Sequence, residues 1–401
     1  MGYDFNRLRE ASGKVAVVGI GDSDYNKDYW TSAGRSRERG VRGEKDAYML
    51  AGVAFRRALE DSGIRKEEID GLAVSGNLEN EVVCELFGLT PGWGSTLKGM
   101  PDLLPHLAVQ AIHAGCCNTV ALINGMDFRS RRSEWGGSQT VATRLCETYF
   151  HPWGYSSPGA QHAHMWQHYM ETYGRKEEDL FLVPYNSRRH ALLNPNAVFN
   201  KKELTFDEWW QSRYICKPLR LLDYCMINDG GTCMILRRAD MAKDSAKPPV
   251  LITGFSWTVP RNAGQLKDRV GDHSYTILKD AVDNCYKMAG AGPKDVSHFT
   301  VYDAFSDILV WSLEACGFCK KGEAIDFIGP SAGNIAFDGK LPCMTSGGHQ
   351  SASYLQGWEQ QTEIVRQLRH EAGPRQVKDA RISLYVHPGG EGPHTIMYQR
   401  G

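Results

Sequence analysis

Five residues in the second half of the chain have side chains suited to proton transfer. Tyr302 and Asp303 follow a short apolar run in VYDAF. His349 and Tyr354 lie within GGHQSASY, and His387 precedes Pro and two Gly in VHPGG. Imidazoles and phenols carry protons in acid–base catalysis, although a phenol with its ordinary pKa of about 10 needs a lowered pKa or a relay to act as base. The same residue types also serve packing, helix caps and turns, so their spacing alone does not assign a role.

Two other groups of residues have the composition of a metal site, and neither predicts one. Cys316 and Cys319 form a single CxxC followed by Lys and Gly, without the second pair that a zinc site needs. His162, His164 and His168 crowd one predicted helix, where packing is the simpler interpretation. We therefore expect no metal and no cofactor bound by this chain.

Composition excludes several classes of protein. The chain has 401 residues, and its 46 Lys and Arg nearly balance 47 Asp and Glu, so no basic field would attract nucleic acid or an anionic membrane. No stretch reaches the length of a membrane span, and the polar N-terminus MGYDFNRLRE has no signal-peptide core. Eleven cysteines, an odd number, indicate reduced thiols and a cytoplasmic protein.

The chain repeats one pattern of elements. In the first half a buried strand from Lys14 precedes an amphipathic helix at about 47–62 and a second strand, and the second half repeats this order from Pro248. A further helix and strand complete each half, with the helices at about 103–114 and 355–371. The sequence thus predicts a duplicated α/β fold with β-α-β-α-β halves.

The polar, Lys-rich segment that ends in Pro-Pro separates the two halves, which we place at residues 1–245 and 246–401. Residues from about 126 to 212 fit neither repeat and form a predicted inserted loop region. Its aromatic residues indicate either a bulky apolar ligand or core packing. They are Trp135, Tyr149, Trp153, Tyr155 and Trp166.

Five segments in order resemble the thiolase superfamily, specifically its sterol-carrier and lipid-transfer branch. The resemblance covers nearly the whole chain and implies a five-layered α-β-α-β-α fold. The segments are YNSRRHALLNPNA, PLRLLDYCMINDGGTCMIL, VYDAFSDILVWSLEACGFCKKGEA, LPCMTSGGHQSASYLQGWEQQTEIVRQLR and LYVHPGGEG.

Four residues that carry thiolase chemistry are replaced in this chain. The resemblance puts the nucleophilic Cys at the start of a buried helix, within Gly94–Pro105, and that window holds no Cys. The Asn of the NEAF motif aligns with Tyr302, the His of the GG…GHP motif with Tyr354, and the second Cys with His387. Without a thiolate there is no acyl-enzyme by the thiolase route.

The chain looks like the lipid-transfer-protein aldolases that shorten steroid side chains. This resemblance implies retro-aldol cleavage of a β-hydroxyacyl-CoA, with Tyr302 and Tyr354 in catalysis. Because a phenol with its ordinary pKa is a poor base, we expect His387 and His349 to relay the proton, and Asp303 to orient the neighbourhood of Tyr302. It also implies a homodimer and a small partner protein with an OB-fold and a zinc ribbon. Two alternatives stay open: an acyltransferase that uses another nucleophile, such as Ser95 or Cys84, and a non-catalytic acyl-CoA or lipid-binding subunit.

Overall fold

Each half of the chain is built on a buried strand against which a helix packs closely. The computed structural model describes residues 9–35, 45–98, 100–131, 153, 157–258, 272–389 and 392–401. A Cβ atom at Gly21 of β1 would lie 2.0 Å from a backbone oxygen of α3, and one at Gly254 of β8 would lie 2.6 Å from a backbone oxygen of α10. Glycine at these positions lets each helix approach its strand, so the two halves solve the same packing problem in the same way.

The strands form one mixed sheet in the order β3-β2-β4-β7-β1-β8-β11-β10-β9, and a separate pair, β5-β6. The first five belong to the first half and the next four to the second. The halves join where Val15–Val17 of β1 pair antiparallel with Val250–Ile252 of β8. The strands are β1 (Val15–Asp22), β2 (Gly71–Gly76), β3 (Trp93–Leu97), β4 (Thr119–Asp127), β5 (Tyr214–Cys216), β6 (Leu219–Arg220), β7 (Asp229–Arg238), β8 (Val250–Trp257), β9 (His298–Val301), β10 (Ile382–His387) and β11 (His394–Arg400).

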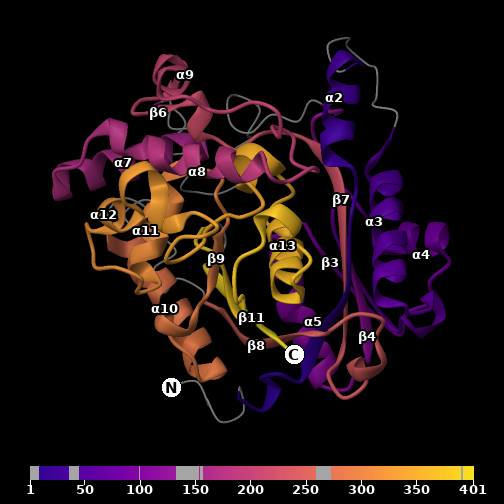
Figure 1. Cartoon of the computed structure of the whole chain (residues 1–401). Helices are drawn as coiled ribbons and strands as arrows, with labels where there is room; N and C mark the ends of the chain where they lie inside the picture. The colour runs from indigo at the N-terminus through magenta and orange to yellow at the C-terminus, as the bar shows by residue number, and fades with distance from the viewer. Residues whose placement is uncertain are drawn as a thin grey trace.

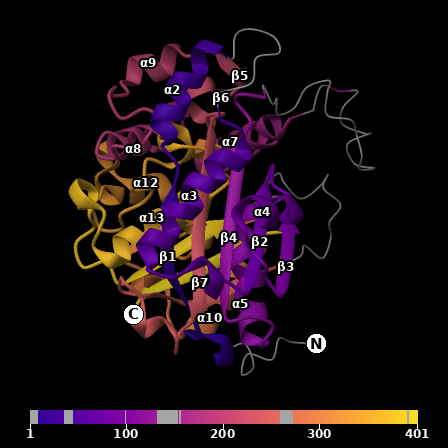
Figure 2. The same ribbon diagram turned by 90° about the vertical axis from the view of Figure 1, so that its right-hand side faces the viewer.

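Helices cover the outer faces of the two half-sheets and fill the space between them (Figures 1 and 2). Helix α3 packs on β1, β4 and β7, helix α10 packs on β8 and β11, and the helices α5 and α13 contact strands of the interior. Three buried apolar clusters alternate with the two half-sheets, as five layers require. The helices are α2 (Tyr25–Arg35), α3 (Ala47–Ser62), α4 (Asn80–Phe87), α5 (Leu104–His113), α7 (Pro158–Tyr173), α8 (Leu182–Ala191), α9 (Phe206–Gln211), α10 (Asp272–Ala289), α11 (Ser306–Ala315), α12 (Ala324–Ile328) and α13 (Trp358–Arg369).

The predicted duplicated α/β fold is confirmed, and the inserted region needs a correction. Its described part is mostly helical (α7, α8 and α9) rather than loop. Two of these helices have side-chain caps that the sequence offered: Ser157 accepts a hydrogen bond from the Ala160 N–H, and Thr205 accepts one from the Glu208 N–H. The predicted division after residue 245 falls between β7 and β8 and stays a prediction.

Candidate active site

Two tyrosine hydroxyls meet inside the molecule. The Oη atoms of Tyr302 and Tyr354 are 2.7 Å apart, a hydrogen bond in which either oxygen can donate. Tyr302 follows the end of β9, and its backbone N–H donates to the carbonyl of Val386 in the neighbouring β10. Tyr354 follows the π-helical turn Gly348–Ala352, and its N–H donates to Asn228 Oδ1 at 2.5 Å. Backbone hydrogen bonds from two parts of the chain thus fix the pair.

Burial keeps both phenols protonated at neutral pH. Desolvation raises the pKa of Tyr302 well above its ordinary value, and the hydroxyl of Tyr354 acts in the same direction. Desolvation also raises the pKa of Tyr354, although hydrogen bonds from Tyr302 and Gln356 oppose the rise. At rest the pair can therefore donate or pass on protons, but neither tyrosine is a standing phenolate.

His387 belongs to the same site. Its ring stacks on the ring of Tyr302, with centroids 4.0 Å apart and an interplanar angle of 25°. Its Nδ1 lies 2.6 Å from Asp102 Oδ2. Desolvation lowers the pKa of His387 below its ordinary value despite the Asp102 charge, so the ring is neutral at neutral pH. No described residue hydrogen-bonds its second nitrogen, Nε2.

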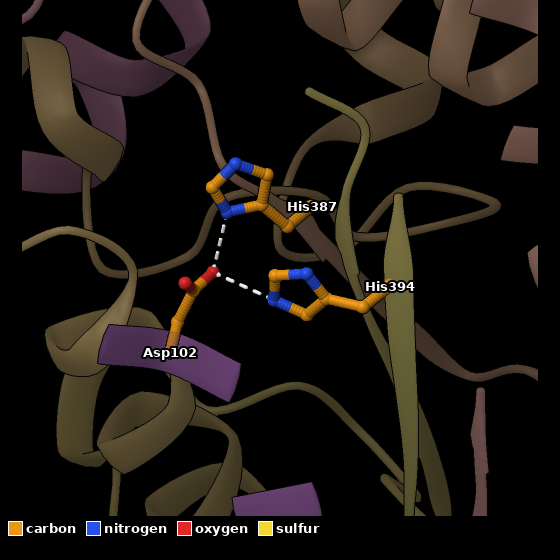
Figure 3. A group of neighbouring side chains, drawn as sticks. All are labelled: Asp102, His387 and His394. Atoms are coloured by element: carbon orange, nitrogen blue, oxygen red, sulfur yellow. Dashed lines mark hydrogen bonds and ion pairs between the residues drawn. The ribbon is translucent and has the colours of Figure 1, made fainter. Parts of the chain in front are cut away.

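Asp102 collects several donors on one oxygen (Figure 3). Besides His387, the Tyr385 hydroxyl donates to Oδ2 at 2.5 Å, and His394 Nε2 lies 3.1 Å away. The carboxylate and the two imidazoles have ligand atoms within 4.8 Å of one another, a spacing that also occurs in metal sites. The 2.6 Å contact is a hydrogen-bond distance, and the tyrosine already uses the same oxygen, so we interpret the group as a hydrogen-bonded network.

His349 lies behind the tyrosines. Its ring meets the rings of Tyr302 and Tyr354 edge-on, with centroids 4.8 and 5.1 Å away. Its Nδ1 is 3.2 Å from Asp303 Oδ1, and its Nε2 is 3.0 Å from Glu359 Oε1. The predicted relay through His349 has no direct route, because its two ring nitrogens face these carboxylates rather than the tyrosine hydroxyls.

Asp303 hydrogen-bonds His349 and Gln360. Its Oδ1 accepts hydrogen bonds from the backbone N–H of His349 at 2.9 Å and from Gln360 Nε2 at 2.6 Å. Desolvation raises the pKa of Asp303 to about 7, although His349 opposes the rise. Of the five predicted site residues, Tyr354, His387 and His349 have rings that surround the ring of Tyr302, and Asp303 supports His349 from behind.

The rival nucleophiles lie elsewhere. Cys84 is on α4 and packs against the outer apolar cluster of the first half, whereas Tyr354 belongs to the central cluster. Desolvation raises the pKa of the Cys84 thiol, so a thiolate is disfavoured there. Ser95 is in the edge strand β3. Within the described part of the chain, neither residue hydrogen-bonds His387, so that imidazole does not serve them as an activating base.

The aromatic residues of the inserted region have different environments. Trp166 is 1% exposed and belongs to the core of the second half, where it also contributes to the wall of a small pocket with Tyr169 and Tyr173. Trp153 is 85% exposed. Trp135, Tyr149 and Tyr155 lie outside the described residues. These aromatic residues therefore add no support for a particular acyl group.

Residues absent from the predicted set complete the site. Asp102 lies inside the window Gly94–Pro105, on a 3-10 turn at the start of helix α5, where the resemblance puts the nucleophile. The absence of cysteine from that window does not point to Asp102, although a carboxylate at the expected position of the nucleophile could have indicated a role for it. His394 and Glu359 had no signal, because both are brought to the site by pairing and packing.

The sequence is similar to known proteins over most of its length. Residues 264–397 match the family described as "Thiolase C-terminal domain-like". A 17-hydroxy-3-oxo-4-pregnene-20-carboxyl-CoA lyase of Mycobacterium tuberculosis is 31% identical over 89% of this chain and 92% of its own. A steroid side-chain-cleaving aldolase of Thermomonospora curvata is 28% identical over 89% of this chain and 90% of its own.

Solved structures give the same result. The structure described as an Ltp2-ChsH2(DUF35) aldolase superposes with a TM-score of 0.85 at 26% identity, covering 97% of this chain and 98% of its own. Human mitochondrial 3-ketoacyl-CoA thiolase, at 13% identity and a TM-score of 0.67, shares the fold over 97% of this chain and 99% of its own. The chain belongs to the thiolase superfamily, in its sterol-carrier branch, with acyl-CoA aldolases and lyases among its relatives.

Proposed function

We propose that this protein is a carbon–carbon lyase that cleaves the Cα–Cβ bond of a bulky β-hydroxyacyl-CoA by retro-aldol reaction. The products are a ketone or aldehyde and a shorter acyl-CoA. The observation that carries the proposal is the pair of buried tyrosine hydroxyls 2.7 Å apart beside a neutral imidazole. The names of the relatives support steroid side-chain degradation as the setting, and lipid metabolism more generally.

The site residues account for every proton in this reaction. The β-hydroxyl proton passes to His387 Nε2, which no described residue hydrogen-bonds, while the Cα–Cβ electrons move into the thioester, which becomes an enolate. The carbonyl product leaves. The enolate then takes a proton at Cα from the tyrosine pair, and His387 returns its proton to the phenols. The protonated phenols also hydrogen-bond the enolate oxygen in a buried site, where such bonds are strong.

This route uses no metal and no cofactor besides the CoA of the substrate. A phenol pair passes a proton without forming a lasting phenolate, which suits two tyrosines whose burial disfavours charge. Dialysis of this chain alone against a strong chelator, before it is combined with any partner protein, should leave the rate of cleavage unchanged. A rate that falls with chelation and returns with added metal would contradict this part of the proposal.

Product analysis tests the reaction type. Incubation with a bulky β-hydroxyacyl-CoA should release a carbonyl compound and a short acyl-CoA in equal amounts, detected by mass spectrometry. In deuterated water one deuterium should appear at Cα of the acyl-CoA, because the enolate is protonated there. A covalent acyl-enzyme found by intact-protein mass spectrometry would instead favour the acyltransferase alternative.

We propose a homodimer that forms through the edge of the first half-sheet. Among the described strands, β3 pairs with β2 alone, so its other side offers unpaired backbone groups. Helix α4 contacts β3, and its Leu86 is 61% exposed, which is unusual for a large apolar residue.

Sedimentation should give about twice the mass of one 44.8 kDa chain. Leu86→Glu should shift the protein toward monomer, because it would bury a charge between copies. Leu221→Glu, which changes a 44% exposed leucine beside the separate β5-β6 pair, is the control and should remain dimeric. Two dimeric variants would exclude α4 from the interface.

A small OB-fold, zinc-ribbon partner belongs to the proposal as well, supported by a solved relative whose description names a second component. Full cleavage activity of the chain purified alone would contradict it.

We also propose a cytoplasmic location, supported by ten described cysteines that are all free. None of the described helices is long and apolar enough to cross a membrane.

A further inference from the structure

The Asp102 carboxylate is fully buried and has no basic side chain bonded to it among the described residues other than imidazoles. Its Oδ2 faces the Tyr385 hydroxyl, His387 Nδ1 and His394 Nε2, at 2.5, 2.6 and 3.1 Å. Desolvation alone would raise the pKa of Asp102, but His387 and His394 hold it well below its ordinary range. The N-terminus of helix α5 adds a favourable dipole. Asp102 is therefore an ionised acceptor at neutral pH.

An ionised acceptor dictates where the protons of its neighbours lie. A carboxylate has no hydrogen to offer, so the 2.6 Å contact requires a hydrogen on His387 Nδ1. In a neutral imidazole the lone pair is then on Nε2. The contact also fixes the rotation of the ring, which stacks on Tyr302 at 4.0 Å.

We propose that Asp102 is a positioning residue for the cleavage, one that fixes the tautomer and orientation of His387 so that Nε2 can accept a proton beside the tyrosine pair. This inference rests on the proposed function. The Asp102 Oδ2 atom is hydrogen-bonded to His387 and Tyr385 and lies 3.1 Å from His394 Nε2, and it contacts neither tyrosine of the reacting pair, so it acts through His387. The same arrangement explains why a carboxylate is buried at the start of a helix, where desolvation would otherwise disfavour it.

The pH dependence has a definite sign. Desolvation lowers the pKa of His387, the Asp102 charge raises it, and the imidazoles of His394 and His349 lower it again. Protonation of His387 removes the acceptor, so the reaction rate should fall as the pH drops through the pKa of this residue. Titratable groups surround His387 on several sides. Asp102 comes from the turn before α5, Tyr385 from β10 and His394 from β11. Tyr302 follows β9, His349 lies in the π-helical turn and Tyr354 follows that turn, and Asp303 and Glu359 contact His349.

The test is Asp102→Asn, which keeps the shape and removes the charge. We expect kcat to fall by about 10²–10⁴ with little change in KM, because an imidazole of the wrong tautomer donates where it should accept. We also expect the acidic limb of the pH profile to move down by about one unit or more, since a charge that raised the pKa of His387 is gone. Glu363→Gln is the matched control. It neutralises a carboxylate that is equally buried on α13 but pairs with Arg375, and should leave the limb in place.

Two results would overturn the proposal. One is a wild-type acidic limb that stays unmoved in Asp102→Asn, because a purely structural role lowers the amount of folded protein without shifting the limb. The other needs no variant of Asp102 and no substrate. Nitrogen NMR of histidine-labelled protein, with the His387 signals assigned by their loss in His387→Gln, should show the hydrogen on Nδ1, and a hydrogen on Nε2 alone would refute the tautomer. If the tautomer is right but no β-hydroxyacyl-CoA is cleaved, the proposed function fails and the positioning of His387 stands.

Discussion

Tyr354→Phe and Tyr302→Phe should each lower kcat for cleavage by about 10²–10⁴, the range that a positioned acid–base group contributes. The two oxygens are 2.7 Å apart, so either substitution breaks the path of the proton. The double variant should be little worse than either single one, because residues that act as one unit are not additive. Single-turnover measurement of the carbonyl product separates this loss from slow product release.

Tyr286→Phe controls for the loss of a buried hydroxyl. Tyr286 is also buried, and its Oη donates to the Cys316 carbonyl at 3.0 Å in the outer core of the second half. All three variants should lose about 1 kcal/mol of unfolding free energy, the usual net value of one hydrogen bond, and only the site variants should lose activity. Normal activity in Tyr302→Phe and Tyr354→Phe would remove the pair from the mechanism and favour the non-catalytic subunit.

The repeat was readable because periodic patterns report local structure. The helix predicted at about 47–62 is Ala47–Ser62, with the cap residue Asp46 accepting from the Met49 N–H. The DGG of Asp229, Gly230 and Gly231, which resembles a turn, is instead the start of β7. Each of these residues pairs with β4 (Gly231 with Gly125), so long-range pairing overrode the local turn signal.

The sequence predicts the site residues that lie in motifs aligned with the family, and it does not predict those that only folding brings together. Tyr302 and Tyr354 are 52 residues apart, and the resemblance to the family aligns both with catalytic positions of the thiolase site. Asp102 and His387 are 285 residues apart, with no shared motif. Likewise Glu359 reaches His349 only because a π-helical turn and the start of α13 fold back on each other. The sequence alone gives no reason to pair the carboxylates of Asp102 and Glu359 with the imidazoles of His387 and His349.

Gly357→Ala should be the most damaging single-methyl change at this site. Gly357 has a φ of +89°, and a Cβ there would lie 1.9 Å from Tyr385 Oη and 3.1 Å from Asp102 Oδ2. The left-handed backbone costs about 1–2 kcal/mol with a side chain, and the overlap adds about 1–3 kcal/mol because the packed interior must shift. We expect a loss of about 2–5 kcal/mol in unfolding free energy, measured by denaturant titration, and a disturbed Tyr385–Asp102 contact that lowers kcat in the protein that remains folded.

Gly373→Ala separates strain from overlap. Gly373 has a similar left-handed φ of +61°, but no atom lies within 4 Å of the position that a Cβ would take there. It should therefore lose only the backbone contribution, about 1–2 kcal/mol, and keep full activity. Equal losses in the two variants would mean that Tyr385 and Asp102 yield freely to a methyl group. In that case the hydrogen bonds to Asp102 Oδ2 do not hold the His387 ring in one orientation. The stacking of this ring on Tyr302 at 4.0 Å must then depend on the surrounding core.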